Sequence, residues 1–187
     1  MRVAGRLAAE VLDMIGEHVV PGVTTEELDL PVPRLHRESR STPFRQTCIT
    51  RGTQRPICAS VNHVVCHGIP GERVLKSGDI VNIDVTVIKE GFHGDTEPHV
   101  LRWQARGAGA APHRKLLRGD VAGHPSRCAP VPTSGDIGHA IQILAESRNF
   151  SVVREYCGHG IGRIYHEDPQ VLHYGEPGTG HRIAKLA

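Results

Sequence analysis

Two aspartates flank a stretch of sequence that predicts a β-hairpin. From Ile80 to Ile88 apolar residues alternate with Asn82, Asp84 and Thr86, and this period of two predicts a strand with one apolar and one polar face. Lys89-Glu90-Gly91 then turns the chain into the stretch 92–96, which contains Asp95. If the hairpin loop is either Lys89-Glu90 or Glu90-Gly91, Asp84 and Asp95 share one face, directly opposite or on a diagonal, roughly 5 to 8 Å apart.

Two carboxylates at this separation predict a cation site. On a half-buried sheet they repel each other unless one takes up a proton or a cation lies between them, and a metal ion is the simplest resolution. The alternative is that both aspartates are ordinary turn or surface residues. That alternative is weakened because Asp84 interrupts an otherwise apolar strand, where a carboxylate is poorly tolerated without a partner.

Three histidines lie in sequence contexts that could serve such a site. His159 is flanked by Gly158, Gly160 and Gly162, so backbone or substrate could approach its ring closely. Taken alone, a histidine in a glycine-rich stretch is more often a turn residue. His67, before Gly68-Ile69-Pro70, and His166, before Glu167, are weaker signals because the chain contains 13 histidines.

The elements that would position these residues show regular patterns. Apolar residues at helical spacing predict an amphipathic helix over 2–18, ended by Pro21-Gly22. Thr24 with Glu27 resembles a capping box that opens a second, short helix. Further on, the sequence predicts a helix from Ser134 or Gly135, a strand over 151–156, and a loop over 157–162.

Two segments, 30–56 and 97–134, show neither helical nor strand periodicity. The first has six Arg against one acidic residue, and the second has five Arg and one Lys against two, although the whole chain carries only +2. Such stretches can mark a nucleic-acid surface. Compensating frameshifts in GC-rich codons explain the Arg, Pro, Ala and Gly content better, so we expect no nucleic-acid partner.

Five ordered segments of the chain resemble the bacterial type I methionine aminopeptidases. The resemblance covers about 120 residues and includes the predicted first helix. The matching segments are 65–70, 78–86, 91–96, 157–162 and 166–173. It implies an α+β "pita-bread" fold, incomplete at the C-terminus, with 1–187 forming a single, incomplete catalytic domain in which 30–56 and 97–134 are atypical.

The resemblance also implies a site and a reaction. Asp84, Asp95 and His159 would be metal ligands for two divalent ions, which could be Co, Mn, Fe or Zn. His67 and His166 would be catalytic and contact the scissile amide, while Cys66 would line the pocket beside the methionine side chain. The implied function is removal of the N-terminal methionine from nascent polypeptides near the ribosome, by a monomer with no membrane partner.

The chain also departs from this family. Two glutamates that complete the family's metal site follow the position of His166, and the sequence reaches Ala187 before either. We therefore expect an incomplete site and little or no turnover by the 187 residues alone. An alternative is a catalytically inactive pita-bread relative that binds ribosome or RNA through its basic segments. Enzymes of this fold that cleave before proline are a weaker option, because the surroundings of His67 look like the methionine type.

Composition indicates the compartment. No apolar run approaches the roughly 20 residues of a membrane span, and the N-terminus lacks a signal-peptide pattern. The five cysteines are an odd number without paired spacing, which argues against a disulfide framework. The sequence therefore predicts a cytoplasmic protein.

Overall fold

A computed structural model describes residues 1–30, 42–43, 55–96, 99–100 and 133–183. The chain divides into two compact units. The first, which we call the sheet unit, comprises residues 1–110 and 162–164, and the second, the helix-hairpin unit, comprises 111–161 and 165–187. The single catalytic domain over 1–187 stays a prediction, and most of 30–56 and 97–134 lies outside the described residues.

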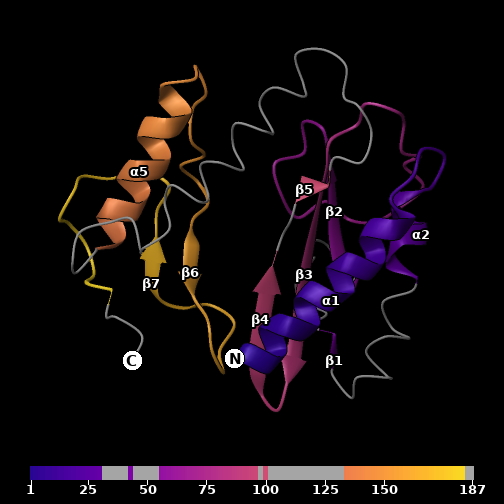
Figure 1. Cartoon of the computed structure of the whole chain (residues 1–187), viewed down its shortest axis with the longest axis horizontal. Helices are drawn as coiled ribbons and strands as arrows, with labels where there is room; N and C mark the ends of the chain where they lie inside the picture. Colours follow the sequence, from indigo (N-terminus) through magenta and orange to yellow (C-terminus); the bar gives the residue numbers. More distant parts are fainter. Residues whose placement is uncertain (31–41, 44–54, 97–98, 101–132, 184–187) are drawn as a thin grey trace. The chain divides into compact units, whose positions relative to one another are not determined.

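In the sheet unit, helix α1 (Arg2–His18) covers one face of the β-sheet, as Figure 1 shows. Its bounds confirm the predicted helix over 2–18. The buried positions recur three, four and seven residues apart, which places them on a single stripe of the helix: Ala4, Ala8, Val11, Leu12 and Ile15. This stripe packs on the central strands of the sheet and forms the main hydrophobic core with them.

The sheet is built around β3 (Val81–Lys89), which pairs antiparallel with every other strand described in it. One edge of β3 carries β2 (Ile57–Val61) and β1 (Thr42–Pro43), and the other carries β4 (Phe92–Thr96) and β5 (His99–Val100). Four valine and isoleucine side chains of β3 are fully buried against α1: Val81, Ile83, Val85 and Val87. The predicted apolar face is therefore confirmed.

The turn between β3 and β4 decides between the two hairpin loops. Lys89 pairs with Phe92, so the loop is Glu90-Gly91. Both loop residues have positive φ, 54° and 77°, as a type I′ turn requires. The close approach of α1 depends on Gly94, because a β-carbon there would overlap the backbone of Ala4.

Helix α2 (Thr25–Asp29) begins with the predicted capping box, in which Thr24 and Glu27 bond each other's backbone N–H groups. It is tied to the start of β2 by Arg55, whose guanidinium lies 2.6 Å from Glu26 and 3.3 Å from Asp29. Burial raises the pKa of Asp29, and the charge of Arg55 opposes that shift. The second helix is thus confirmed and anchored to the sheet.

The helix-hairpin unit contains α5 (Ser134–Glu146) and a two-stranded sheet of β6 (Gly158–Gly160) and β7 (Glu167–Val171). Thr133 caps α5 through a box with Asp136, so the predicted start at Ser134 is confirmed. The predicted strand over 151–156 is wrong, since these residues form no strand. The predicted loop over 157–162 contains the short strand β6 instead, because Gly158 and His159 pair with β7.

Two further sequence expectations concern the membrane and the cysteines. Among the described residues, no helix is both long and apolar enough to cross a bilayer. Cys66 and Cys157 are not disulfide-bonded. Cys58 in β2 is disulfide-bonded.

Candidate metal and catalytic site

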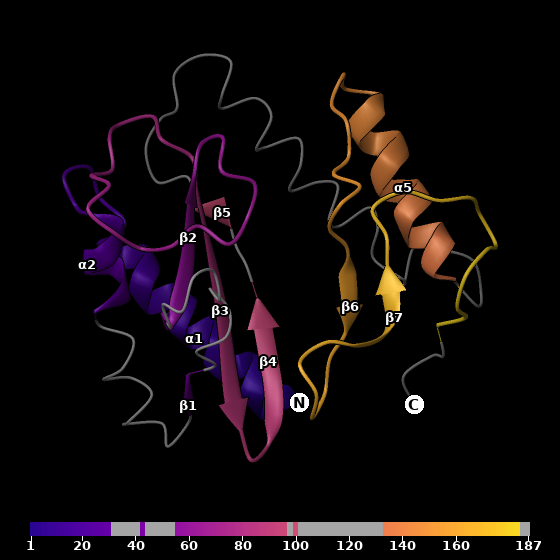
Figure 2. The ribbon, with the colours of Figure 1, turned by 180° about the vertical axis from the view of Figure 1, so that it is seen from behind.

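The polar face of the sheet unit carries both candidate carboxylates. β3 presents Asn82, Asp84 and Thr86 on the face away from α1, and this is the face nearer the viewer in Figure 2. Asp95 in β4 lies directly opposite Thr86 in the strand register. Asp84 is two residues before Thr86, so the two aspartates form a diagonal pair, roughly 7 Å apart. The structure thus selects the diagonal of the two predicted arrangements.

Asp95 is held by a neighbour on the same face. The hydroxyl of Thr86, which is fully buried, donates a hydrogen bond of 2.6 Å to Asp95 Oδ1. A carboxylate offers about four lone-pair sites, so this bond is compatible with Asp95 also binding a cation.

His159 lies in β6, opposite Gln170 of β7, next to a register shift at Gly160. Its Nδ1 is 2.8 Å from the Gly160 carbonyl oxygen. A carbonyl oxygen only accepts, so Nδ1 carries the hydrogen and donates, and the neutral ring has its lone pair on Nε2. Histidines that bind metals use this arrangement, because the bond from the second nitrogen fixes the tautomer.

His166 lies directly against His159. The two ring centroids are 4.4 Å apart at 68°, and the Tyr165 ring contacts both, at 5.3 Å from His159 and 4.4 Å from His166. A β-carbon at Gly160 would overlap the Asp168 backbone, so the glycine lets β6 and β7 approach closely. Two of the candidate site residues, His159 and His166, are therefore neighbours within the helix-hairpin unit.

His67 is exposed in the loop 62–80, with a positive φ of 55°. The next residue, Gly68, fixes this part of the loop, because its carbonyl accepts from Ala59 N–H and a side chain there would overlap the Ala59 backbone. The far end of the loop is held by Asp79, which accepts from the Asn62 side chain at 2.8 Å and from Lys76 N–H at 2.9 Å.

A hollow of about 420 Å³ adjoins His67. Its lining is mostly apolar, from Ala59, Val61, Val64 and Ile69, and it includes His63 and Arg73. Cys66 is partly buried but is not among the residues that line this hollow. The role of Cys66 beside the methionine side chain therefore stays a prediction.

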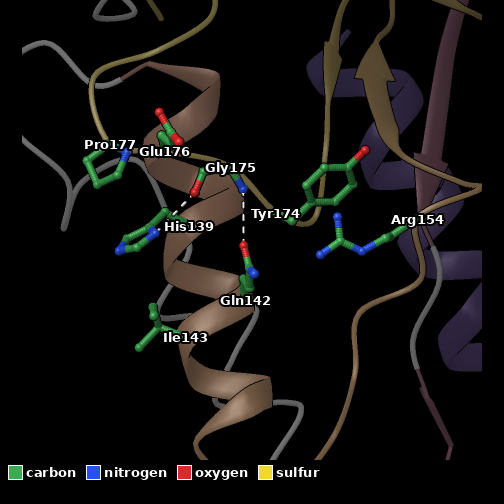
Figure 3. A pocket seen from close by; sticks show the side chains of 8 residues that line it. All are labelled: His139, Gln142, Ile143, Arg154, Tyr174, Gly175, Glu176 and Pro177. Carbon is green, nitrogen blue, oxygen red and sulfur yellow. Dashed lines mark hydrogen bonds between the residues drawn. The ribbon is translucent and has the colours of Figure 1, made fainter.

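A second hollow, of about 390 Å³, lies between α5 and the segment after β7, and Figure 3 shows it from close by. His139 Nδ1 donates to the Gly175 carbonyl oxygen at 3.1 Å, and Gln142 accepts from Gly175 N–H at 3.3 Å. The Arg154 guanidinium lies 4.2 Å from the centroid of Tyr174. None of the predicted site residues lines this hollow.

The donor types fit a divalent ion, since carboxylate oxygens and an imidazole nitrogen suit Mn, Fe, Co or Zn. Within the described ranges, no group of three or more His, Cys, Asp or Glu side chains could hold a metal ion. Asp84 and Asp95 belong to the sheet unit and His159 to the helix-hairpin unit. The three-residue ligand set stays a prediction.

Sequence reasoning gave no role to three residues that the structure places beside the candidates. Thr86 bonds Asp95, and the alternation Asp84-Val85-Thr86 was a signal that could have indicated it. Tyr165 contacts both histidines, without a periodic signal to reveal it. Cys58 in β2 lies directly opposite Asp84 in the strand register. The strand pattern of the sequence does not reveal which strand pairs with β3, so it could not indicate this neighbour.

Comparison with known proteins agrees with this fold. The profile of metallopeptidase family M24 matches residues 1–185. A methionine aminopeptidase of Rickettsia prowazekii is 44% identical, with 96% of this chain and 68% of that protein covered. The Escherichia coli K12 methionine aminopeptidase is 48% identical, with 93% and 66% covered. The crystal structure of the Rickettsia prowazekii enzyme superposes with a TM-score of 0.90 at 43% identity, covering 98% of this chain and 73% of that one.

The chain belongs to metallopeptidase family M24. Within that family its near relatives are bacterial methionine aminopeptidases, so the resemblance and the α+β pita-bread fold are confirmed. The chain spans about two thirds of the length of the curated relatives it matches. The family is one of metal-dependent hydrolases, and the inactive RNA-binding alternative is not favoured.

Proposed function

We propose that the chain is a metal-dependent aminopeptidase that removes the N-terminal methionine from newly made proteins in the cytoplasm. The observation that carries this proposal is the diagonal pair of Asp84 and Asp95 on the polar face of β3 and β4. Two carboxylates on one face repel each other unless one takes up a proton or a cation lies between them, and the membership in a metallopeptidase family favours the cation.

We propose that Asp84, Asp95 and His159 would hold two divalent ions. When bound, such ions activate water as a nucleophile and polarise the carbonyl of the scissile amide. The bond from His159 Nδ1 to the Gly160 carbonyl supports this role, because the hydrogen on Nδ1 leaves the Nε2 lone pair available to a metal ion.

His67 and His166 would act on the substrate itself. An imidazole N–H can donate to the amide oxygen as negative charge develops on it, which stabilises the transition state more than the ground state. The contact between His166 and His159 supports this assignment, since it puts a hydrogen-bond donor next to a metal ligand. Cys66 would lie beside the methionine side chain. The substrates would be nascent chains near the ribosome, and the protein would act as a monomer.

Release of methionine from a Met-Ala-Ser peptide, with added Mn²⁺ or Co²⁺, tests this function. The 187 residues alone should release little or no methionine. In a chain extended to the length of the Escherichia coli relative, with 30–56 and 97–134 replaced by that relative's sequence, we expect release to require the metal, Asp95→Ala to abolish it, and His67→Ala to reduce turnover while metal content stays largely intact. Asp13→Asn is a matched control, because Asp13 is exposed on α1 and its loss should change nothing.

The Escherichia coli relative, assayed in parallel, serves as the positive control. The ratio of its rate of methionine release to that of this chain measures how much slower this chain is. Absence of metal binding together with absence of methionine release would contradict the proposed function. An RNA affinity that falls steeply with salt would then favour the binding alternative.

A further inference from the structure

The proposed function assigns no role to the hydroxyl of Thr86. It lies on the central strand of the sheet, fully buried, on the polar face with Asp84. A buried hydroxyl needs a hydrogen-bond partner, and its donor bond goes to Asp95 Oδ1 at 2.6 Å. Thr86 thus touches one of the two carboxylates and lies two residues along the strand from the other.

This hydrogen bond restricts the side-chain rotation of Asp95, which the backbone alone does not restrict. Asp95 is exposed and lies near the end of β4, so its side chain would otherwise rotate among several staggered conformers. Thr86 is β-branched and lies in a strand, and its own rotamer is therefore restricted. A short bond from a fixed hydroxyl to Oδ1 selects one orientation of the carboxylate.

We infer that Thr86 is a positioning residue for the metal site: its hydroxyl holds Asp95 in the orientation that binds the ion. The inference rests on the proposed function, because it assigns a purpose to Asp95 as a ligand. Partners that orient a ligand from outside the coordination sphere typically contribute a factor of 10 to 100 to metal affinity.

The test compares Thr86→Val and Thr86→Ser by calorimetric titration with Mn²⁺. Valine keeps the shape and the branching but removes the hydroxyl, whereas serine keeps the hydroxyl. We expect Thr86→Val to bind Mn²⁺ about 10- to 100-fold more weakly than the wild-type chain, and Thr86→Ser to restore most of the loss. Thr96→Val is the matched control, because Thr96 pairs with Val85 and lies on the other face of the sheet.

A second readout separates positioning from a purely structural role. The visible absorption of bound Co²⁺ reports coordination number and geometry, and we expect Thr86→Val to change its intensity at saturating Co²⁺. Circular dichroism of each variant shows that the fold is retained. If Thr86→Val melts at a different temperature but has wild-type Mn²⁺ affinity and a wild-type Co²⁺ spectrum, Thr86 is only structural and the inference is wrong.

The two hypotheses fail in different ways. Wild-type Mn²⁺ affinity in Thr86→Val overturns the role of Thr86 alone and leaves the aminopeptidase proposal standing. Absence of Mn²⁺ binding by the wild-type chain contradicts the proposed function, and the role of Thr86 falls with it.

Discussion

The carboxylates and the imidazoles of the candidate site are held by different means. In the sheet unit, Asp84 lies on a nine-residue strand, and on the other face of that strand the side chains from Val81 to Val87 are fully buried against α1. In the helix-hairpin unit, the short strands β6 and β7 contain no buried residue, and His159 is held by one backbone hydrogen bond and by contacts with two rings. Packing of the core therefore fixes the first group, whereas local contacts fix the second.

This difference predicts how far the structural effect of a mutation extends in each unit. A change in the packing of the sheet should lower the stability of the whole sheet unit, because a buried core is cooperative and closely packed. A change near β6 should move the histidines and leave the sheet unit intact. The following predictions test that contrast, from the largest expected effect to the smallest.

Replacement of Gly94 by valine should have the largest effect. A side chain at this position overlaps the backbone of Ala4, so α1 must move off the sheet. We expect the free energy of unfolding to fall by about 3 kcal/mol or more, measured by thermal or urea denaturation. Gly16→Ala is the control: it lies in α1 with open space around it, and alanine there should stabilise the helix by about 0.5 to 1 kcal/mol. An equal loss in both variants would show that α1 does not depend on this contact.

Replacement of Gly160 by alanine should act locally. The new β-carbon overlaps the Asp168 backbone, which would separate β6 from β7 and disturb the ring contact between His159 and His166. We expect large NMR shifts of both histidine rings and an unfolding free energy of the sheet unit within about 0.5 kcal/mol of the wild-type value. In the control Gly158→Ala, the β-carbon meets Val171 O at an ordinary 3.4 Å. Unchanged histidine signals in Gly160→Ala would contradict the local account.

Replacement of Asp79 by asparagine should cost less than Gly94→Val, should disturb only one loop, and should depend on pH. Burial alone would raise the pKa of Asp79, but hydrogen bonds from Asn62 and from Lys76 N–H, with the charge of Arg73, outweigh it and lower the pKa below 3.8. The stabilisation is therefore present above about pH 3.8 and is lost as pH falls through the lower, folded-state pKa.

At pH 7 we expect Asp79→Asn to cost about 1 to 2 kcal/mol, measured by urea unfolding, and the cost should shrink toward pH 3. Glu72→Gln, on the same loop and exposed, should show neither effect. A cost that is constant with pH would mean that the charge of Asp79 is not what holds the loop that carries His67.

The hairpin and its carboxylate pair could be predicted because a strand has a side-chain period of two. Alternation alone placed Asp84 on the polar face and Val85 on the buried one. It did not choose between the two loops, since both have two residues. The choice follows from the turn, in which Gly91 adopts a positive φ without strain.

The histidine contacts could not be predicted in the same way. β6 and β7 are too short for a periodic signal, and the register shift at Gly160 breaks the alternation that would place His159 on a face. The stretch 151–156 has a strand-like composition, yet a strand also needs a hydrogen-bonding neighbour, which composition does not reveal. The fold around Asp84 was therefore readable from sequence, and the surroundings of His159 were not.

The central proposal is that Asp95 and His159 are both ligands of the metal centre. A calorimetric double-mutant cycle tests it most directly: Mn²⁺ affinity is measured for the wild-type chain, Asp95→Asn, His159→Gln and the double variant. If both residues bind the same cluster, each single substitution weakens binding, and the total loss in the double variant, measured from the wild-type chain, is smaller than the sum of the two single losses. Wild-type affinity in His159→Gln, or losses that simply add, would contradict the claim.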